Sequence, residues 1–275
     1  MRMIRARFRL AATLGILLVT SACGTSPIER PAATNVEVSS CHLLTTPEEN
    51  EAVSDTKPAV PCTSDHTSET FRIANVLGSL AASDSRPNSS RLAAVTSQYC
   101  TVEMLRDYLG ARDRDTSSAL GITAYFPETT AWSAGDRTVR CDLVVKSPGS
   151  DEPVLLTGSL QDVMATPASA RLRTCYPDAP FPEPSKEPSL TVVLCSEPHV
   201  GEDINAWLNI NNSNPPEAEV LGQCTPFAEE FFAPAPIPEA VAVTGIIVPG
   251  NGMSTLRCAV RSKDSKTLKG TLLHD

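Results

Sequence analysis

The chain has 275 residues, of which 41% are hydrophobic, 20% charged and 5% aromatic, and its formal net charge is −9. A hydrophobic fraction near the globular average excludes wholesale disorder, and the length suffices for one large domain or two of average size. The negative charge argues against nucleic-acid binding, which needs a basic face for the phosphates.

The first residues have the layout of a secretory signal. Four arginines form a basic start, and an uncharged run over residues 10–22 follows. This run is shorter than a membrane-spanning helix usually is. Small residues before Cys23 resemble a bacterial lipobox, where the peptide is cut before the Cys and the thiol carries diacylglycerol. We expect a lipoprotein signal peptide over 1–22, and lipidated Cys23 with a flexible tether over 23–35. The alternative is an ordinary signal peptide.

Export would leave an acidic protein. Residues 1–22 contain four of the 23 basic residues and no acidic residue, so the remainder has 19 basic and 32 acidic residues, a net charge of −13. An anionic leaflet repels such a chain, so the acyl anchor would hold it to the bilayer. We expect it on the outer face of the cytoplasmic membrane.

The rest of the chain contains an internal repeat. Cys62-x-x-x-His66-x-x-Glu69 matches a second C-x-x-x-H-x-x-E motif with His199 and Glu202. A Gly five residues before an Arg-Cys pair, and a later glycine-containing segment, also recur in the same order. These matches indicate two copies of one module, over residues 36–165 and 166–275.

The remaining eight cysteines, an even number in an exported chain, indicate four disulfides. Val192–Cys195 has strand composition and follows Cys175 across a Pro-rich turn, so a hairpin would bring the two cysteines together. Four cysteines in each copy allow three connectivities. We favour Cys41–Cys62, Cys100–Cys141, Cys175–Cys195 and Cys224–Cys258.

Hydrophobic spacing predicts short helices and strands. In chain order, we expect helices at Arg91–Ser97, Thr101–Leu109, Asp203–Leu208 and Pro226–Phe232, and strands at Thr123–Phe126, Arg137–Lys146, Val154–Leu160, Thr244–Val248, Thr255–Arg261 and Leu268–Leu273. The predicted class is α+β, with two tandem small antiparallel-sheet domains of one or two short helices each, stabilised by disulfides.

A longer motif pattern resembles a known family. The first copy contains Cys62, His66, Glu69, Cys100, Trp132, Gly135, Arg137 and Cys141; the second contains Cys195, His199, Glu202, Cys224, Gly252 and Cys258, with Pro249 and Ser254 in the Trp and Arg places. This pattern resembles the septum formation family of actinobacterial envelope proteins. The resemblance implies an exported, disulfide-bonded module, often lipid- or helix-anchored, with a link to cell division. It implies no defined chemical activity.

The candidate binding residues are His66, Glu69, Trp132, His199 and Glu202. Each His–Glu pair suggests a metal or small-ligand site, but zinc normally needs three or four protein ligands, so a structural role is favoured. Trp132 is a ligand or core residue, with core favoured. His42 matches nothing in the second copy and is expected at the surface.

No G-x-S-x-G or nucleotide-binding loop occurs in the sequence. We therefore expect no catalytic residue, no metal and no cofactor. The predicted function is a non-catalytic binding or scaffolding role in the cell envelope, with envelope or division proteins as partners. A metal- or ligand-binding lipoprotein and, less favoured, an envelope hydrolase are the alternatives.

Overall fold

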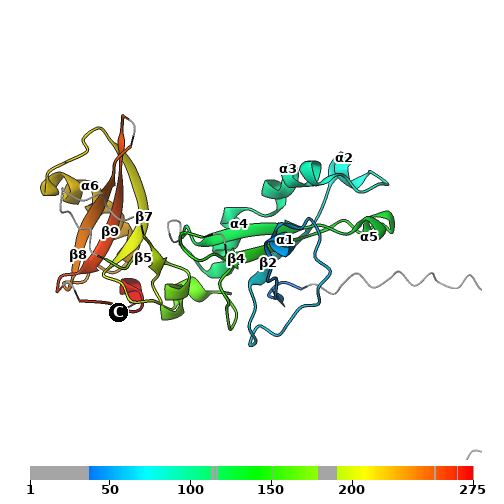
Figure 1. Ribbon diagram of the computed structural model, residues 1–275, viewed down its shortest axis with the longest axis horizontal. Coiled ribbons are helices and arrows are strands. Elements are labelled where there is room, and N and C mark those ends of the chain that lie inside the picture. Colours follow the sequence, from blue (N-terminus) through cyan, green and yellow to red (C-terminus); the bar gives the residue numbers. More distant parts are fainter. Residues whose placement is uncertain are drawn as a thin grey trace, which may run out of the picture. The chain divides into compact units, whose positions relative to one another are not determined.

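The described residues form two antiparallel sheets with short helices, an α+β fold as predicted (Figure 1). The structure is a computed structural model that describes residues 37–112, 115, 117–150, 152–178, 191–250, 252–264 and 266–274. The predicted signal peptide, Cys23 and the tether lie outside these residues. Among the described helices, none has the length and apolar character needed to cross a membrane.

The first sheet has the strand order β1-β2-β4-β3. Its strands are β1 (Cys41–His42), β2 (Ser68–Asn75), β3 (Leu120–Tyr125) and β4 (Thr138–Val145), and its helices are α1 (Pro47–Glu51), α2 (Gly78–Ala81), α3 (Ser89–Tyr99), α4 (Val102–Leu109) and α5 (Thr129–Ser133). Alternate β4 residues, including Leu143, pack with Leu92 of α3 and Leu105 of α4 in one buried cluster. The intervening β4 residues, Arg140 and Asp142, are left for the other face of the sheet.

The second sheet has the order β6-β5-β7-β9-β8. Its strands are β5 (Thr174–Tyr176), β6 (Val193–Leu194), β7 (Gly201–Ile210), β8 (Val241–Val248) and β9 (Ser254–Ser262); α6 spans Glu217–Phe232, and 3-10 turns occur at η1 (Val163–Ala165), η2 (Pro167–Arg171) and η3 (Leu272–His274). Helix α6 lies against the sheet (Figure 1). Its Phe231 and Phe232 belong to the same buried cluster as Leu256 of β9.

The two sheets share one arrangement of strands. β5-β7-β9-β8 repeats the order β1-β2-β4-β3, and all these neighbours are antiparallel. β2 has a register shift between Thr70 and Arg72, and β7 has one between Asp203 and Ala206. Each irregularity follows the Glu of a C-x-x-x-H-x-x-E motif, so the motif has the same position in both sheets.

Four disulfides cross-link these elements, and they join the pairs that the sequence favours: Cys41–Cys62, Cys100–Cys141, Cys175–Cys195 and Cys224–Cys258. In each sheet one bond links neighbouring extended segments and the other links a helix region to the central strand, β4 or β9. Cross-links of this kind stabilise a fold by about 2–4 kcal/mol each.

Several predicted elements are wrong. Asp203–Leu208 is part of strand β7, not a helix, because its bulge disturbs the alternation of buried and exposed residues. Helix α6 begins at Glu217, nine residues before Pro226, which lies inside it. Val154–Leu160 and Leu268–Leu273 are not strands; each contributes an isolated bridge, to His66 and to His199.

Candidate functional site

The C-x-x-x-H-x-x-E motif holds the chain segment that follows the last strand of each sheet. In the first sheet, the backbone of His66 exchanges two hydrogen bonds with Leu156, and the Gly158 N–H donates to the Cys62 carbonyl. In the second sheet the same bonds join His199 to Leu268 and Gly270 to Cys195. The spacing of the motif thus matches the spacing of backbone contacts along a neighbouring segment.

The glutamates complete this contact. Glu69 is fully buried and accepts hydrogen bonds from the Ser159 hydroxyl (2.6 Å), the Leu160 N–H (2.7 Å) and the Tyr108 hydroxyl. Its carboxylate is therefore committed to fixing the segment, which is a structural role.

Glu202 has the same role in the second sheet. It is also fully buried, and it accepts from the Thr271 hydroxyl (2.8 Å) and the Leu272 N–H (2.8 Å). The guanidinium Nε of Arg173 lies 3.7 Å away. Burial raises the pKa of the Glu202 carboxyl, because the ionised form loses its hydration.

The two histidine rings are buried beside disulfides. Nδ1 of His66 lies 2.9 Å from the Ser64 carbonyl oxygen, and Nδ1 of His199 lies 2.8 Å from that of Glu197. Atoms of His66 and Glu69 lie together with Cys41, whereas His199 lies with both cysteines of its disulfide and without Glu202. The structure therefore brings together only the first of the two His–Glu pairs that the sequence proposes as sites.

Trp132 lies in the core of the first sheet. It is fully buried, and its indole N–H donates to the Ser83 carbonyl (2.9 Å). The guanidinium of Arg137 lies 4.1 Å from the ring centroid and donates to the carbonyls of Ala81 and Ser83. The Trp-x-x-Gly-x-Arg motif thus fastens the end of α2 to α5.

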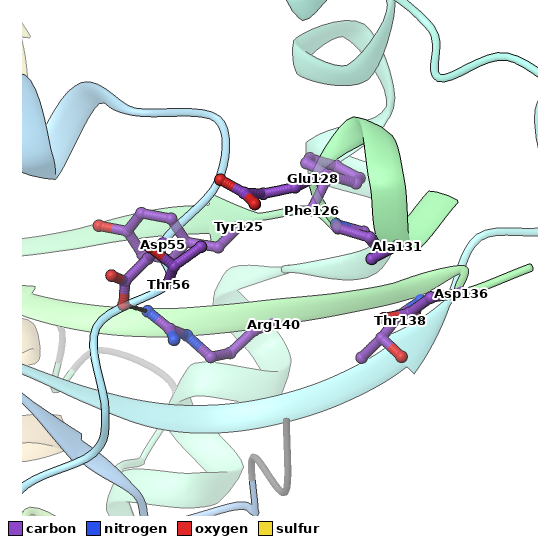
Figure 2. Close-up of a pocket in the computed structure, with 10 residues that line it drawn as sticks. Asp55, Thr56, Tyr125, Phe126, Glu128, Ala131, Asp136, Thr138 and Arg140 are labelled. Carbon is purple, nitrogen blue, oxygen red and sulfur yellow. Dashed lines mark hydrogen bonds and ion pairs between the residues drawn. The ribbon is translucent and has the colours of Figure 1, made fainter. Parts of the chain in front are cut away.

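The first sheet carries a pocket of about 170 Å³ near the junction of β3, β4 and α5. Figure 2 shows Arg140 reaching Asp55, with Tyr125 above this pair and Glu128 and Ala131 projecting from the opposite wall. The complete lining is Asp55, Thr56, Tyr125, Phe126, Pro127, Glu128, Ala131, Asp136, Thr138 and Arg140. Aromatic walls and an excess of carboxylates over cations give the pocket an amphipathic, acidic character.

A buried ion-pair network forms the pocket floor. Arg140 on β4 bonds to Asp55 (2.7 Å) and to Asp142 (2.9 Å), and its guanidinium lies 4.4 Å from the Tyr125 ring centroid. Asp142 is fully buried and also accepts from the Thr70 hydroxyl at 2.8 Å. One guanidinium therefore bonds to two carboxylates, and these two contacts fix the position of the Arg140 side chain.

His42 belongs to the same network and is buried, not at the surface as the sequence suggests. Its Nδ1 lies 3.6 Å from Asp55, and its Nε2 lies 3.4 Å from the Thr70 hydroxyl. Burial lowers the pKa of His42; Asp142 and Asp55 oppose this shift, and Arg140 adds to it. The ring is therefore held in its neutral form near neutral pH.

A comparison with protein-family models identifies the family of this chain. The family model described as "Septum formation" matches residues 39–239. The chain belongs to the septum formation family. The match begins just before Cys41 and ends between α6 and β8, so the pocket and both His motifs of this family member lie within it. No curated protein and no solved structure matches the chain.

The second sheet has a related ion pair between Asp203, which lies within the family match, and Arg257, which lies beyond it. Arg257 precedes Cys258 as Arg140 precedes Cys141, and it bonds to Asp203 at 2.6 Å. Asp203 pairs across the strands with Ala259, at the position where the first sheet pairs Thr70 with Asp142. The carboxylate lies on a different strand from Asp142, but an Arg–Asp pair again lies next to the cysteine of the central strand.

Sequence reasoning missed the residues of the pocket floor. His42, Asp55 and the β4 pair Arg140 and Asp142 come from three separate places in the chain and form no motif. One signal was present: Arg140 and Asp142 alternate with apolar residues on a predicted strand, which indicates a second, polar face. The partners of that face follow only from the fold.

Proposed function

We propose that this member of the septum formation family is an exported lipoprotein, anchored through Cys23 to the outer face of the cytoplasmic membrane, that acts by binding envelope or division proteins. The basic and apolar layout of residues 1–22 and the small residues before Cys23 support the anchor. Four disulfides support export to an oxidising compartment.

In this proposal, the chain consists of two tandem copies of one module. Support comes from the shared strand order, the two disulfides in each copy and the repeated contacts of the C-x-x-x-H-x-x-E motif. The residues beneath the two sheets' Arg–Asp pairs differ, since Tyr176 stands after Cys175 where the first copy has His42. Duplication followed by divergence would give one copy a recognition role of its own.

The pocket carries the binding proposal. Its floor is rigid because Arg140 is held by Asp55 and Asp142, and its walls combine aromatic and acidic groups. Preformed concave sites of this composition are typical of binding sites. The ten lining residues include no Ser, Cys or His, so the lining holds no serine- or cysteine-type nucleophile with a histidine base.

A plugged pocket tests this function. Ala131 is a half-buried wall residue on α5, and Ala134, just after α5, is exposed and outside the lining. We expect Ala131→Phe to fill the pocket and to abolish in-cell crosslinks to division or wall-synthesis proteins, while Ala134→Phe keeps them. Crosslinks that are equally strong in both variants, with both folded by circular dichroism, would contradict the pocket as the binding site.

A further inference from the structure

Among the described residues, the buried rings of His66 and His199 each leave Nε2 without a hydrogen-bond partner. Nδ1 of His199 lies 2.8 Å from the Glu197 carbonyl oxygen, so Nδ1 carries the proton and donates it, and Nε2 keeps a lone pair. That Nε2 is buried and has no hydrogen-bond partner among the described residues. An unpaired acceptor inside a protein costs free energy, so its retention needs a physical reason.

The surroundings of His199 supply metal ligands. One of its ring nitrogens and the Sγ atoms of Cys175 and Cys195 all lie within 4.8 Å of one another, and all three residues are fully buried. Tetrahedral zinc, with bonds of about 2.3 Å to sulfur and about 2.0 Å to nitrogen, separates its ligand atoms by roughly 3.5–3.8 Å. The three groups are therefore already at a spacing that small side-chain rotations convert into a zinc site.

The hydrogen bond of His199 also fits a metal ligand. Ligating histidines usually donate their second ring N–H to a carboxylate or a backbone carbonyl, which fixes the tautomer and orients the free nitrogen. The Glu197 carbonyl does this for His199. In the oxidised chain the two sulfur atoms are bonded to each other in the disulfide, so they are not available as thiolate ligands for a metal ion.

We propose that reduction of the Cys175–Cys195 disulfide creates a Zn²⁺ site made of two thiolates and Nε2 of His199. A dithiol supplies two electrons and two protons: it becomes a disulfide, and Cys175 and Cys195 become thiols. Zn²⁺ then displaces the two thiol protons to solvent and leaves a fourth position for an external ligand. The bound ion then links β5 to the residue after β6 in place of the disulfide. This inference is independent of the pocket.

The first sheet provides a matched contrast. Nε2 of His66 is equally buried and unpaired, but the ligand atoms near His66 come from Cys41 and Glu69, without Cys62. Glu69 is already committed to its hydroxyl and N–H donors. We therefore expect one tight site per chain, in the second sheet, and His66→Ala is the control for His199→Ala.

The test measures metal binding by the whole purified chain before and after treatment with a dithiol. Co²⁺ is the first probe, because thiolate ligands give it a charge-transfer absorption, and Zn²⁺ then displaces it. We expect no binding by the oxidised chain and one ion per reduced chain. Loss of a residue that hydrogen-bonds to a metal ligand already weakens metal binding by about 10–100-fold. His199→Ala removes a ligand itself, so it should weaken binding at least about tenfold. His66→Ala should leave it unchanged.

Further controls separate this site from unfolded thiols. Circular dichroism of the reduced, metal-loaded chain should show the native spectrum, and concentrated urea should release the ion. Cys175→Ser with Cys195→Ser should bind none. Four results would each overturn the proposal: no stoichiometric binding by the folded reduced chain, binding by the oxidised chain, equal losses in the two His variants, or binding that persists in urea.

Discussion

At Arg140 a single guanidinium is ion-paired with two buried carboxylates, Asp55 and Asp142, and the pocket above depends on this arrangement. Arg140→Met keeps much of the side-chain volume but leaves both acids without their cation. Breaking a buried pair by removing one partner costs about 3–5 kcal/mol, because an uncompensated charge stays in the interior. We expect a loss of unfolding free energy of this size in urea denaturation.

An exposed lysine gives the control for this variant. Lys266 lies 2.6 Å from the carboxylate of Asp264, and both side chains are exposed. Exposed pairs contribute little to stability, so Lys266→Met should change the unfolding free energy little. If Arg140→Met lost no more stability than Lys266→Met, the network would not be the support of the pocket floor.

His199 makes the stability of the oxidised chain depend on pH. Burial lowers its pKa below the usual value of 6.5, and the unfolded ring returns to that value. Between the two values the unfolded chain binds more protons, so the unfolding free energy decreases as the pH falls below about 6.5. For this one group the slope reaches up to about 1.4 kcal/mol per pH unit.

The variant His199→Asn isolates this contribution. The Asn side-chain N–H can replace Nδ1 as donor to the Glu197 carbonyl, and it does not titrate. Urea denaturation between pH 7 and 5 should show a shallower loss of stability in the metal-free variant than in the parent chain. Parallel pH profiles for the two would show that His199 does not titrate on unfolding in this range.

At the scale of elements, the sequence predicts the helices and hairpins that are determined by residues near one another in the chain. Helix α4 begins after Thr101, whose hydroxyl accepts from the Met104 N–H, and ends at Gly110 in the left-handed region. The β5–β6 hairpin was predictable because its strands are close in sequence, and the hairpin in turn places Cys175 next to Cys195.

Strand β7 could not be read in the same way. Ile204 and Ala206 are both buried in one cluster, and between them Asn205 has a φ of 54°, at the bulge. The irregular backbone removes the period of two that identifies a strand, so the sequence there resembles a short helix. The pocket was hidden for a related reason: the cross-strand pair of Thr70 and Asp142 depends on a register set by a bulge in β2.

At the scale of the whole molecule, charge determines how the chain can meet a membrane. Without residues 1–22 its net charge is −13, so an anionic leaflet repels it and gives no electrostatic attachment. If Cys23 carries the anchor, attachment depends on acyl chains alone. It should then resist salt and yield to detergent, since buried methylene groups and not ion pairs hold it.

Cys23→Ser tests this attachment directly in cells. We expect the variant to leave the membrane fraction and to appear in the soluble envelope fraction or the medium, while Thr25→Ala, two residues along the same tether, stays with the membrane. Fractionation after a high-salt wash, with detection of the chain by immunoblot, makes the measurement. Retention of Cys23→Ser through that wash would mean that another part of the chain, or a bound partner, holds it to the membrane despite the repulsion between its acidic body and the leaflet.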